Sequence, residues 1–277
     1  MKTVVLFLVV VFVVAAAAAA ARTLAATPST TIDITHRLIA RRLPNYGSPR
    51  GIPPFIVPQT SINSGDAFNS FNFTLNTHWG THVDAPGHFN QTLLDLGYDV
   101  DHLDVTTLRG PCLVVDIPRD KNITEQVMRE LDIPRGVKRV LFKTLNTDRR
   151  LMHQAEFDGS YTAFTTTGAR YLVDNTDIKL VGIDYLSIGI GVQDEVIGVH
   201  LTLLNMKDII PVEGLNLDDV VPGIYTVRCH PLRFPGFDGS PARCILQTLG
   251  SSARWLSPTG SLVILFFHLI VYFCLLS

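Results

Sequence analysis

The apolar residues between positions 30 and 249 fall into short runs that are separated by proline, glycine and charged residues. The runs at residues 112–117, 139–145 and 180–185 are rich in β-branched and aromatic side chains, which is typical of buried strands. Residues 168–173 and 195–205 instead favour helices. Strands that alternate with helices along the chain predict an α/β domain.

The remaining segments extend this expectation. We expect further strands at residues 31–38, 209–212, 225–232 and 244–249, and a proline-rich loop at residues 51–58. A helix is predicted over residues 122–131, capped by Asn122 with Glu125 three residues later, as in a capping box. No repeat or low-complexity linker interrupts residues 30–249, which predicts a single domain of mixed strands and helices over residues 27–250.

Both ends of the chain are apolar. Residues 1–26 start with one lysine, continue as an apolar run and end in alanine-rich sequence, the pattern of a cleaved secretory signal peptide; an uncleaved signal anchor is the alternative. Residues 251–277 join small residues and a short spacer to a hydrophobic stretch, which is typical of a GPI-attachment signal. A short transmembrane anchor and a segment with no part in the fold are the other interpretations of this tail.

Three N-x-S/T sequons, at Asn72, Asn90 and Asn122, are consistent with secretion. On this interpretation the protein is an extracellular glycoprotein of the cell wall or matrix, with a membrane tether if the tail directs lipid attachment. The net charge of −2 gives no electrostatic reason to expect nucleic acid or an anionic membrane as a partner.

The chain has four cysteines, of which Cys274 lies in the tail. They form no CxxC pair, so a thiolate zinc site is not expected. Cys229 and Cys244 could form a disulfide in a secreted protein. Cys112 lies inside an apolar run and is expected to be a small core residue.

The residues most able to carry chemistry lie together in the segment HWGTHVDAPGHF, residues 78–89. His78, His82, Asp84 and His88 place three imidazoles and one carboxylate within eleven residues. Nitrogen and oxygen donors of this kind suit zinc, manganese or iron(II). Each residue alone has an ordinary structural explanation, but a structural role for the whole set would need every member satisfied separately.

The spacing of this segment has a geometric interpretation. On an extended chain His82 and Asp84 point to one face, and His78 would share that face if the segment stays extended. Gly80 would let the backbone pass close to a metal or substrate. Pro86 would then turn the chain so that His88 folds back over the site.

HWGTHVDAPGHF resembles the H-x-G-T-H-x-D-x-P-x-H signature of the cyclase-like, or kynurenine formamidase-type, metal hydrolases. Further phrases resemble the plant branch of this family: DITHRL, VDIPRDKNIT, LFKTLNTDRRLM, LVDNTDIKLVGIDYLS, VEGLNLDD and SPARCIL. The resemblance implies a swivelling β/β/α-type fold and a homo-oligomer, a dimer or larger. It also implies hydrolysis of a carbon–nitrogen bond in a small-molecule formamide or cyclic amide, such as N-formylkynurenine or isatin.

The resemblance also implies which residues form the site. His78, His82 and Asp84 match the first group of metal ligands, His200 and Glu213 match the remaining ligands, and His88 matches the catalytic histidine. Such a set would hold one or two divalent ions, with zinc expected first and manganese as the alternative. We expect a metal-activated water as nucleophile, with His88 as general base and then general acid.

Two segments depart from the family pattern. Trp79 stands where relatives have a smaller residue, so it either stacks on an aromatic substrate or packs in the core. Residues 188–198 differ from the bacterial formamidases, which leaves the substrate open. The rival function is a non-catalytic metal-containing binding or regulatory module at the cell surface or in the extracellular matrix. The intact His88 speaks against this module, because a purely structural site needs no proton shuttle. A cyclase or lyase of polyketide-like substrates is a second rival, which the family name suggests and the ligand set does not.

Overall fold

The computed structural model describes residues 29–249, of which residues 31–246 form one compact unit. This unit is a mixed α/β domain, so the predicted fold class is confirmed. The predicted signal peptide (residues 1–26) and tail (residues 251–277) lie outside the described residues. Within residues 29–249, no helix combines the length and the apolarity that crossing a membrane would require.

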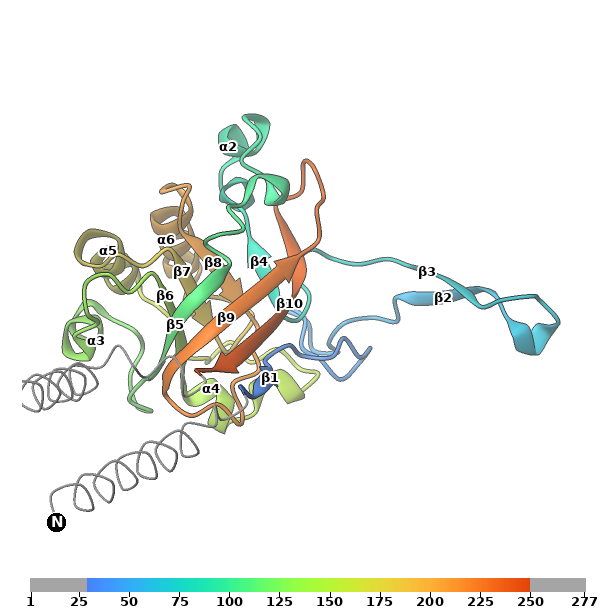
Figure 1. Cartoon of the computed structure of the whole chain (residues 1–277), viewed down its shortest axis with the longest axis horizontal. Helices are drawn as coiled ribbons and strands as arrows, with labels where there is room; N and C mark the ends of the chain where they lie inside the picture. The colour runs from blue at the N-terminus through green and yellow to red at the C-terminus, as the bar shows by residue number, and fades with distance from the viewer. Residues whose placement is uncertain (1–28, 250–277) are drawn as a thin grey trace, which may run out of the picture. The chain divides into compact units, whose positions relative to one another are not determined.

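Strands of one sheet form the body of the domain (Figure 1). In chain order they are β1 (Thr31–Asp33), β4 (His82–Asp84), β5 (Arg109–Asp116), β6 (Arg139–Lys143), β7 (Leu180–Ile183), β8 (Ile210–Glu213), β9 (Gly223–Pro231) and β10 (Gly239–Thr248). Among the described residues the sheet order is β1-β10-β4-β8-β7-β6-β5-β9, and a further β9–β10 pairing closes seven of these strands into a barrel. Strands β5 to β8 are parallel, whereas β4 and β9 run antiparallel to their neighbours β8 and β5.

The parallel strands are joined by helical crossovers, as parallel pairing requires. The helices are α2 (Gln91–Asp95), α3 (Glu125–Leu131), α4 (Leu145–Asp148), α5 (Thr166–Asn175) and α6 (Gln193–Leu204), and 3-10 turns span Ile62–Ser64, Pro86–His88, Val100–His102 and Leu151–His153. Helices α3, α5 and α6 lie together beside the parallel strands (Figure 1). Glycines allow this close packing, since a Cβ at Gly168 would lie 1.9 Å from the carbonyl oxygen of Ile123.

Alternate residues of strands β5, β6 and β7 belong to two apolar clusters. On β6, Val140 and Phe142 join the cluster that includes the helices, whereas Leu141 joins the cluster inside the barrel. Cys112 is buried in the barrel cluster as a free thiol, as predicted. Burial on both faces explains why these strands appear in the sequence as continuous apolar runs.

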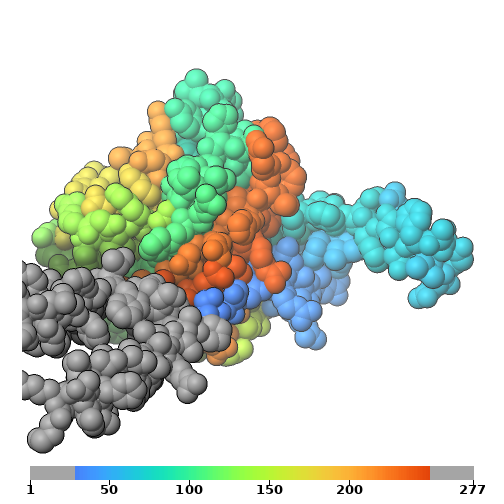
Figure 2. Space-filling view, in the orientation of Figure 1, coloured from blue at the N-terminus to red at the C-terminus, as the bar shows by residue number. Residues whose placement is uncertain are grey.

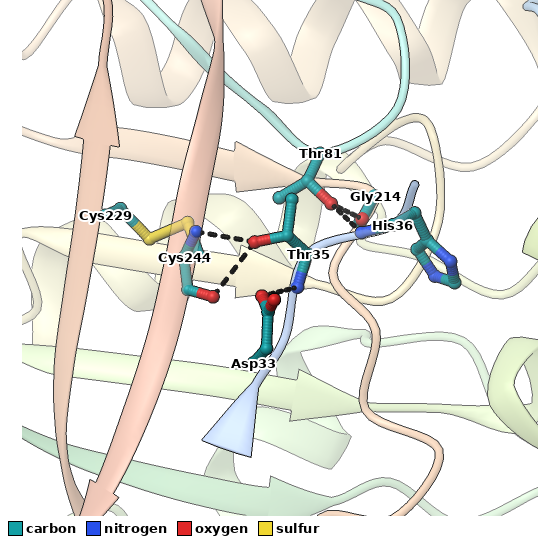
Figure 3. Close-up of a disulfide and its surroundings, with 7 residues drawn as sticks. All are labelled: Asp33, Thr35, His36, Thr81, Gly214, Cys229 and Cys244. Atoms are coloured by element: carbon teal, nitrogen blue, oxygen red, sulfur yellow. Dashed lines mark hydrogen bonds between the residues drawn. A yellow bond between two sulfur atoms is a disulfide. The ribbon is translucent and has the colours of Figure 1, made fainter. Parts of the chain in front are cut away.

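A disulfide joins Cys229 to Cys244, so the predicted pairing is confirmed. It links β9 to β10, the two strands whose pairing closes the barrel (Figure 3). Thr35 accepts a hydrogen bond from the amide of Cys244 at 2.8 Å, and the amide of His36 donates to Oγ1 of Thr81 at 2.9 Å. Residues 33–36 therefore connect the disulfide-linked strand β10 to Thr81, the residue before strand β4.

A separate hairpin projects from the barrel, formed by β2 (Ile56–Thr60) and β3 (Ser70–Phe73) (Figure 1). Its first strand corrects the prediction of a loop over residues 51–58. Pro58 suggested a loop, but an edge strand tolerates a proline because an outward-facing amide needs no partner.

The predicted helix over residues 122–131 is shorter than expected, and its cap is different. Thr124 caps α3 by accepting from the amide of Val127, so the assignment of Asn122 as the cap was wrong. Asn122 accepts instead from the amide of Ala163 at 3.4 Å. Glu125 forms an ion pair with Arg129 one turn later rather than closing a capping box.

Candidate metal centre

Strand β4 places His82 and Asp84 on one face, fully buried, as the alternation predicted. Antiparallel pairing then sets His82 directly opposite Glu213 of β8 and Asp84 opposite Gly239 of β10. The Nε2 atom of His82 lies 3.2 Å from Oε2 of Glu213 and 3.6 Å from Oδ1 of Asp84. A pairing between strands 130 residues apart thus brings Glu213 to the motif.

His78 reaches the same cluster from a turn, not from an extended segment as predicted. Gly80 adopts a left-handed φ of +66°, which bends the chain between His78 and β4. A Cβ at Gly80 would also lie 2.8 Å from the side chain of Leu38, so packing and backbone conformation account for this glycine, not an approach to a metal. The turn leaves Nδ1 of His78 3.1 Å from Oδ1 of Asp84.

His200 enters from α6 and Glu213 from the end of β8, so both predicted partners join the cluster. The Nε2 atom of His200 lies 3.3 Å from Oε1 of Glu213 and 3.7 Å from Oδ2 of Asp84. The His200 ring stacks on Phe89, with the ring centroids 4.2 Å apart. Glu213 also accepts from the amide of Ile188 at 2.7 Å, which fixes its carboxylate.

The imidazole orientations show what the cluster can bind. Nδ1 of His82 donates to the carbonyl of Gly80, and Nδ1 of His200 donates to the carbonyl of Val196. The Nε2 atom of each neutral ring is therefore an acceptor, and it faces carboxylate oxygens that are acceptors as well. Within the described residues, Nε2 of His82 and both carboxylate oxygens of Asp84 are buried without a hydrogen-bond partner. Only positive charge between these atoms satisfies them, and the donor set fits a divalent ion.

The pKa values of the cluster lead to the same conclusion, that the buried carboxylates need positive charge beside them. Burial alone raises the pKa of Asp84, but the imidazoles of His88 and His78 hold it well below its usual range. Burial disfavours an imidazolium at His200, yet the contact with Glu213 raises its pKa overall. The pKa of Glu213 is lowered, because His200 and His82 outweigh burial and the charge of Asp84. Protons on the imidazoles thus occupy the role that a metal ion would take.

Asp238, which the sequence did not single out, completes the site. Its Oδ2 atom lies 2.8 Å from Nε2 of His78 and 2.9 Å from Nδ1 of His88, and Oδ1 accepts from Oγ1 of Thr77 at 3.0 Å. Burial disfavours an imidazolium at His78, but Asp238 and Asp84 outweigh burial and raise the pKa of His78 to about 10. Asp238 precedes Gly239, where a Cβ would lie 2.8 Å from the His78 ring. An aspartate before Gly-Ser-Pro carries no sequence signal for this role.

His88 lies at the edge of the cluster, where the chain turns at Pro86 as predicted. Its ring stacks on that of His78 with the centroids 3.9 Å apart, and 23% of its side chain is exposed. Since Nδ1 is held by Asp238, Nε2 is the ring atom available to a bound molecule. His78, His82 and Asp84 offer ligand atoms within 4.8 Å of one another, and so do Asp84, His88 and His200.

A cavity of about 290 Å³ opens over the cluster. Its apolar and aromatic walls are formed by Tyr46, Phe89, Leu186 and Val196. The polar cluster forms the floor of the cavity. Val196 belongs to the segment 188–198 that departs from the family pattern. Trp79 does not line this cavity; it is buried against Phe55 and donates to Asn45, so it packs in the fold.

A closed mixed barrel with a buried histidine–carboxylate cluster beneath a small cavity defines a class of metal-binding α/β proteins. The family described as "Putative cyclase" matches residues 32–189. The chain is 53% identical over 215 residues to Cyclase-like protein 3 of Oryza sativa subsp. japonica, covering 78% of each. The chain therefore belongs to the cyclase family.

More distant relatives carry other names. The chain is 32% identical over 190 residues to the kynurenine formamidase of Geobacillus thermodenitrificans, covering 69% of this chain and 82% of that protein. A solved structure described as a potential metal-dependent hydrolase with cyclase activity superposes with a TM-score of 0.63 at 30% identity, covering 79% and 98% of the two chains.

Proposed function

We propose that this chain is a metal-dependent hydrolase that cleaves the carbon–nitrogen bond of a formamide or cyclic amide. The observation that carries the proposal is the set of buried atoms in need of a cation, Nε2 of His82 and both oxygens of Asp84, directly beside His88. The similarity to a kynurenine formamidase supports the choice of bond.

Five side chains would hold the metal: His78, His82, Asp84, His200 and Glu213. They provide nitrogen and oxygen donors, which suit zinc or manganese, and Asp84 lies between the two histidine groups, so one or two ions could be held. A bound divalent ion would supply Lewis acidity toward a substrate carbonyl and toward water.

His88 is the group placed to move a proton. Asp238 fixes its Nδ1–H, which leaves Nε2 as an acceptor facing the cavity. In the proposed reaction Nε2 takes a proton from the attacking water and then gives it to the departing nitrogen. The stacked ring of His78 keeps the imidazole of His88 in one orientation.

The cavity supports a small substrate. Its volume of about 290 Å³ is at the lower end of the usual range for ligand sites. Tyr46 and Phe89 offer aromatic surfaces against which a planar ring could pack, while the polar cluster forms the floor. An aromatic amide of one or two rings has matching shape and polarity.

We also propose that the protein works outside the cell. The signal-like residues 1–26, the sequons and the Cys229–Cys244 disulfide support this, because disulfides persist in oxidising compartments. A membrane tether through residues 251–277 remains part of the proposal.

Metal content and turnover test the enzymatic proposal together. Purified protein should contain stoichiometric zinc or manganese and hydrolyse N-formylkynurenine or isatin. His82→Ala should lose both metal and activity, whereas His88→Ala should retain metal and lose activity. Bound metal with no turnover of any amide, lactam or ester would favour the non-catalytic binding module, and folded wild-type protein that binds no metal would overturn the proposal.

A further inference from the structure

The segment between β1 and β2 includes a loop at residues 41–52 that reaches the metal cavity. The segment, in blue, lies at the surface of the domain beside the base of the projecting hairpin (Figure 2). The amide of Arg41 donates to the carbonyl of Ile52 at 2.8 Å, and the amide of Ile52 donates to the carbonyl of Leu43 at 3.0 Å. Leu43 and Ile52 are also buried in the core cluster that includes the helices. Hydrogen bonds and packing therefore fix the base of the loop.

The tip of this loop is a tight turn over residues 45–48. The amide of Ser48 donates to the carbonyl of Asn45 at 2.8 Å, and Gly47, the third residue of the turn, has a left-handed φ of +68°. This hydrogen bond and this glycine are typical of a type II turn. Tyr46, the second residue, lines the metal cavity, and 53% of it is exposed. The turn therefore presents the Tyr46 side chain to the cavity.

Two contacts from other parts of the chain hold the ends of the turn. The indole N–H of Trp79 donates to Oδ1 of Asn45 at 3.1 Å, and the amide of Phe157 donates to the carbonyl of Ser48 at 2.9 Å. The ring of Phe157 also packs against that of Tyr46, with the centroids 4.6 Å apart. The position of the Tyr46 ring thus depends on Trp79 at one end of the turn and on Phe157 at the other.

The hydrogen bond to Asn45 gives Trp79 a role that a smaller or purely apolar residue would not fill. Trp79 is buried, and it directly follows the proposed metal ligand His78. Its ring packs against Phe55, a contact that another aromatic residue could keep. The indole N–H is the group that reaches Asn45, and a phenyl ring has no such donor. Trp79 therefore links the metal-binding turn to the loop that carries Tyr46.

Tyr46 is the aromatic wall of the cavity that is open to a bound molecule. Phe89, the other aromatic residue of the walls, is stacked on His200, with the ring planes 16° apart. Aromatic rings attract one another in offset or edge-to-face arrangements, beyond the effect of the area that they bury. An aromatic ring in the cavity therefore gains a contact with Tyr46 that a small aliphatic molecule cannot make.

We propose that Tyr46 determines substrate specificity by packing against an aromatic ring of the substrate, and that Trp79 is a positioning residue that holds Tyr46 in place through Asn45. This inference rests on the proposed hydrolase function and adds to it the residues that select the substrate. The selected class consists of amides with an aromatic ring next to the carbon–nitrogen bond that is cleaved, and small aliphatic amides bind weakly.

Steady-state kinetics of the purified, metal-loaded protein test the role of Tyr46, with formanilide as an aromatic formamide and N-methylformamide as an aliphatic one. Tyr46→Ala should raise KM for formanilide by about tenfold and change kcat less, because the lost contact contributes to binding. KM for N-methylformamide should not respond, since this molecule has no ring. Tyr46→Phe keeps the ring and should restore most of the affinity. Phe68→Ala, at an exposed aromatic residue that does not line the cavity, is the matched control and should match wild type.

Variants at the other two positions test the hydrogen bond that holds the turn. Asn45→Ala and Trp79→Phe each remove one partner, so each should raise KM for formanilide, and the double variant should be no worse than either alone. Asn45→Asp keeps an oxygen that accepts from the indole and should restore KM. Amide hydrogen exchange of residues 41–52 should be faster in Asn45→Ala and Trp79→Phe than in wild type or Asn45→Asp, whether or not the protein turns over an amide.

The outcomes separate this inference from the proposed function. Turnover with an unchanged KM for formanilide in Tyr46→Ala would overturn the role of Tyr46 and leave the hydrolase standing. If wild type hydrolyses neither formamide, the proposed function fails, and calorimetric titration with formanilide replaces KM; wild type that binds no formanilide would then overturn the role of Tyr46. Unchanged exchange of residues 41–52 in Asn45→Ala would overturn the role of Trp79. Loss of metal from Asn45→Ala would also overturn it, because the effect would then act through His78.

Discussion

His88 and Asp238 lie in contact, Nδ1 to Oδ2 at 2.9 Å, although 150 residues separate them in sequence. The same carboxylate oxygen lies 2.8 Å from Nε2 of His78. A carboxylate that accepts from a ring N–H fixes the tautomer and raises the basicity of the other ring nitrogen. Asp238 therefore couples a proposed metal ligand to the proposed proton carrier and positions both.

Asp238→Asn should lower activity by roughly 10- to 100-fold, the usual cost of removing such a supporting carboxylate. An amide at this position cannot accept from both rings as strongly, so His88 loses its preferred orientation. We expect the metal to bind more weakly as well, because His78 is affected. Metal titration by calorimetry, beside kcat measured at saturating metal, separates the two effects.

Asp218→Asn is the matched control, because Asp218 holds His153 through a similar 2.8 Å contact outside the site. This variant should keep wild-type metal affinity and kcat. Equal losses in the Asp218 and Asp238 variants would assign both to general destabilisation. A fully active Asp238→Asn enzyme would remove the positioning role.

His36 predicts sensitivity to acid. Burial, with a contribution from the neighbouring His153, lowers the pKa of His36 to about 4. The unfolded chain protonates this ring near 6.5, so between pH 6.5 and pH 4 the unfolded state binds more protons and folding stability falls as pH falls. The loss should approach roughly 3 kcal/mol at pH 4 and then level off.

Urea unfolding of wild type and His36→Gln at pH 7 and pH 5 measures this loss. Lowering the pH from 7 to 5 should reduce the free energy of unfolding more for wild type than for His36→Gln, since only wild type carries the buried imidazole. His102→Gln, at a side chain that is 70% exposed, is the control and should follow wild type. A pH-independent difference for His36→Gln would show that this ring does not contribute to acid sensitivity.

The disulfide should stabilise the barrel measurably. Cys229 and Cys244 are 15 residues apart, and a loop of that length is worth about 3 kcal/mol in the chain-entropy account. A reductant should therefore lower the Tm of wild type. Cys229→Ala with Cys244→Ala should have the lower Tm from the start and should not respond to reductant. If reductant lowered the Tm of both proteins equally, the effect would not come from this disulfide.

Four of the site residues could be predicted from the sequence because they lie close together along the chain. His78, His82, Asp84 and His88 occupy eleven residues, and alternation along a strand was enough to place His82 and Asp84 on one face. His200 and Glu213 came only from the resemblance to a family. Asp238 was missed because it reaches the site through the β10–β4 pairing, which no sequence spacing reveals.

The fold shows the same division. The buried parallel strands were recognisable as apolar runs, and the barrel closure through β9 and β10 was not, because strand order depends on long-range pairing. The start of β2 was predicted as part of a loop over residues 51–58, since this exposed strand contains a proline and has no buried face to give it a pattern. The cap of helix α3 lies two residues after the expected one, because both Asn122 and Thr124 can cap a helix and the side chain of Asn122 contacts Ala163 instead.

If the protein is secreted, its sequons should differ in whether they carry a glycan. Asn72 is exposed on strand β3 of the projecting hairpin, so a glycan there extends into solvent. Asn90 instead accepts from the amide of Leu93 as a helix cap and donates to Asn205 at 3.0 Å. Its amide group is therefore already part of the fold, and a glycan at Asn90 would compete with these contacts.

Expression in a eukaryotic secretory host, followed by intact-mass measurement, distinguishes the sites. Asn72→Gln should remove the mass of one glycan and leave the Tm unchanged. Asn90→Gln should leave the glycan mass unchanged and lower stability by about 1 kcal/mol through loss of the cap. A glycan on Asn90 in folded protein would mean that the α2 cap and the Asn205 contact give way to the sugar, and an unmodified Asn72 would count against passage through the secretory route.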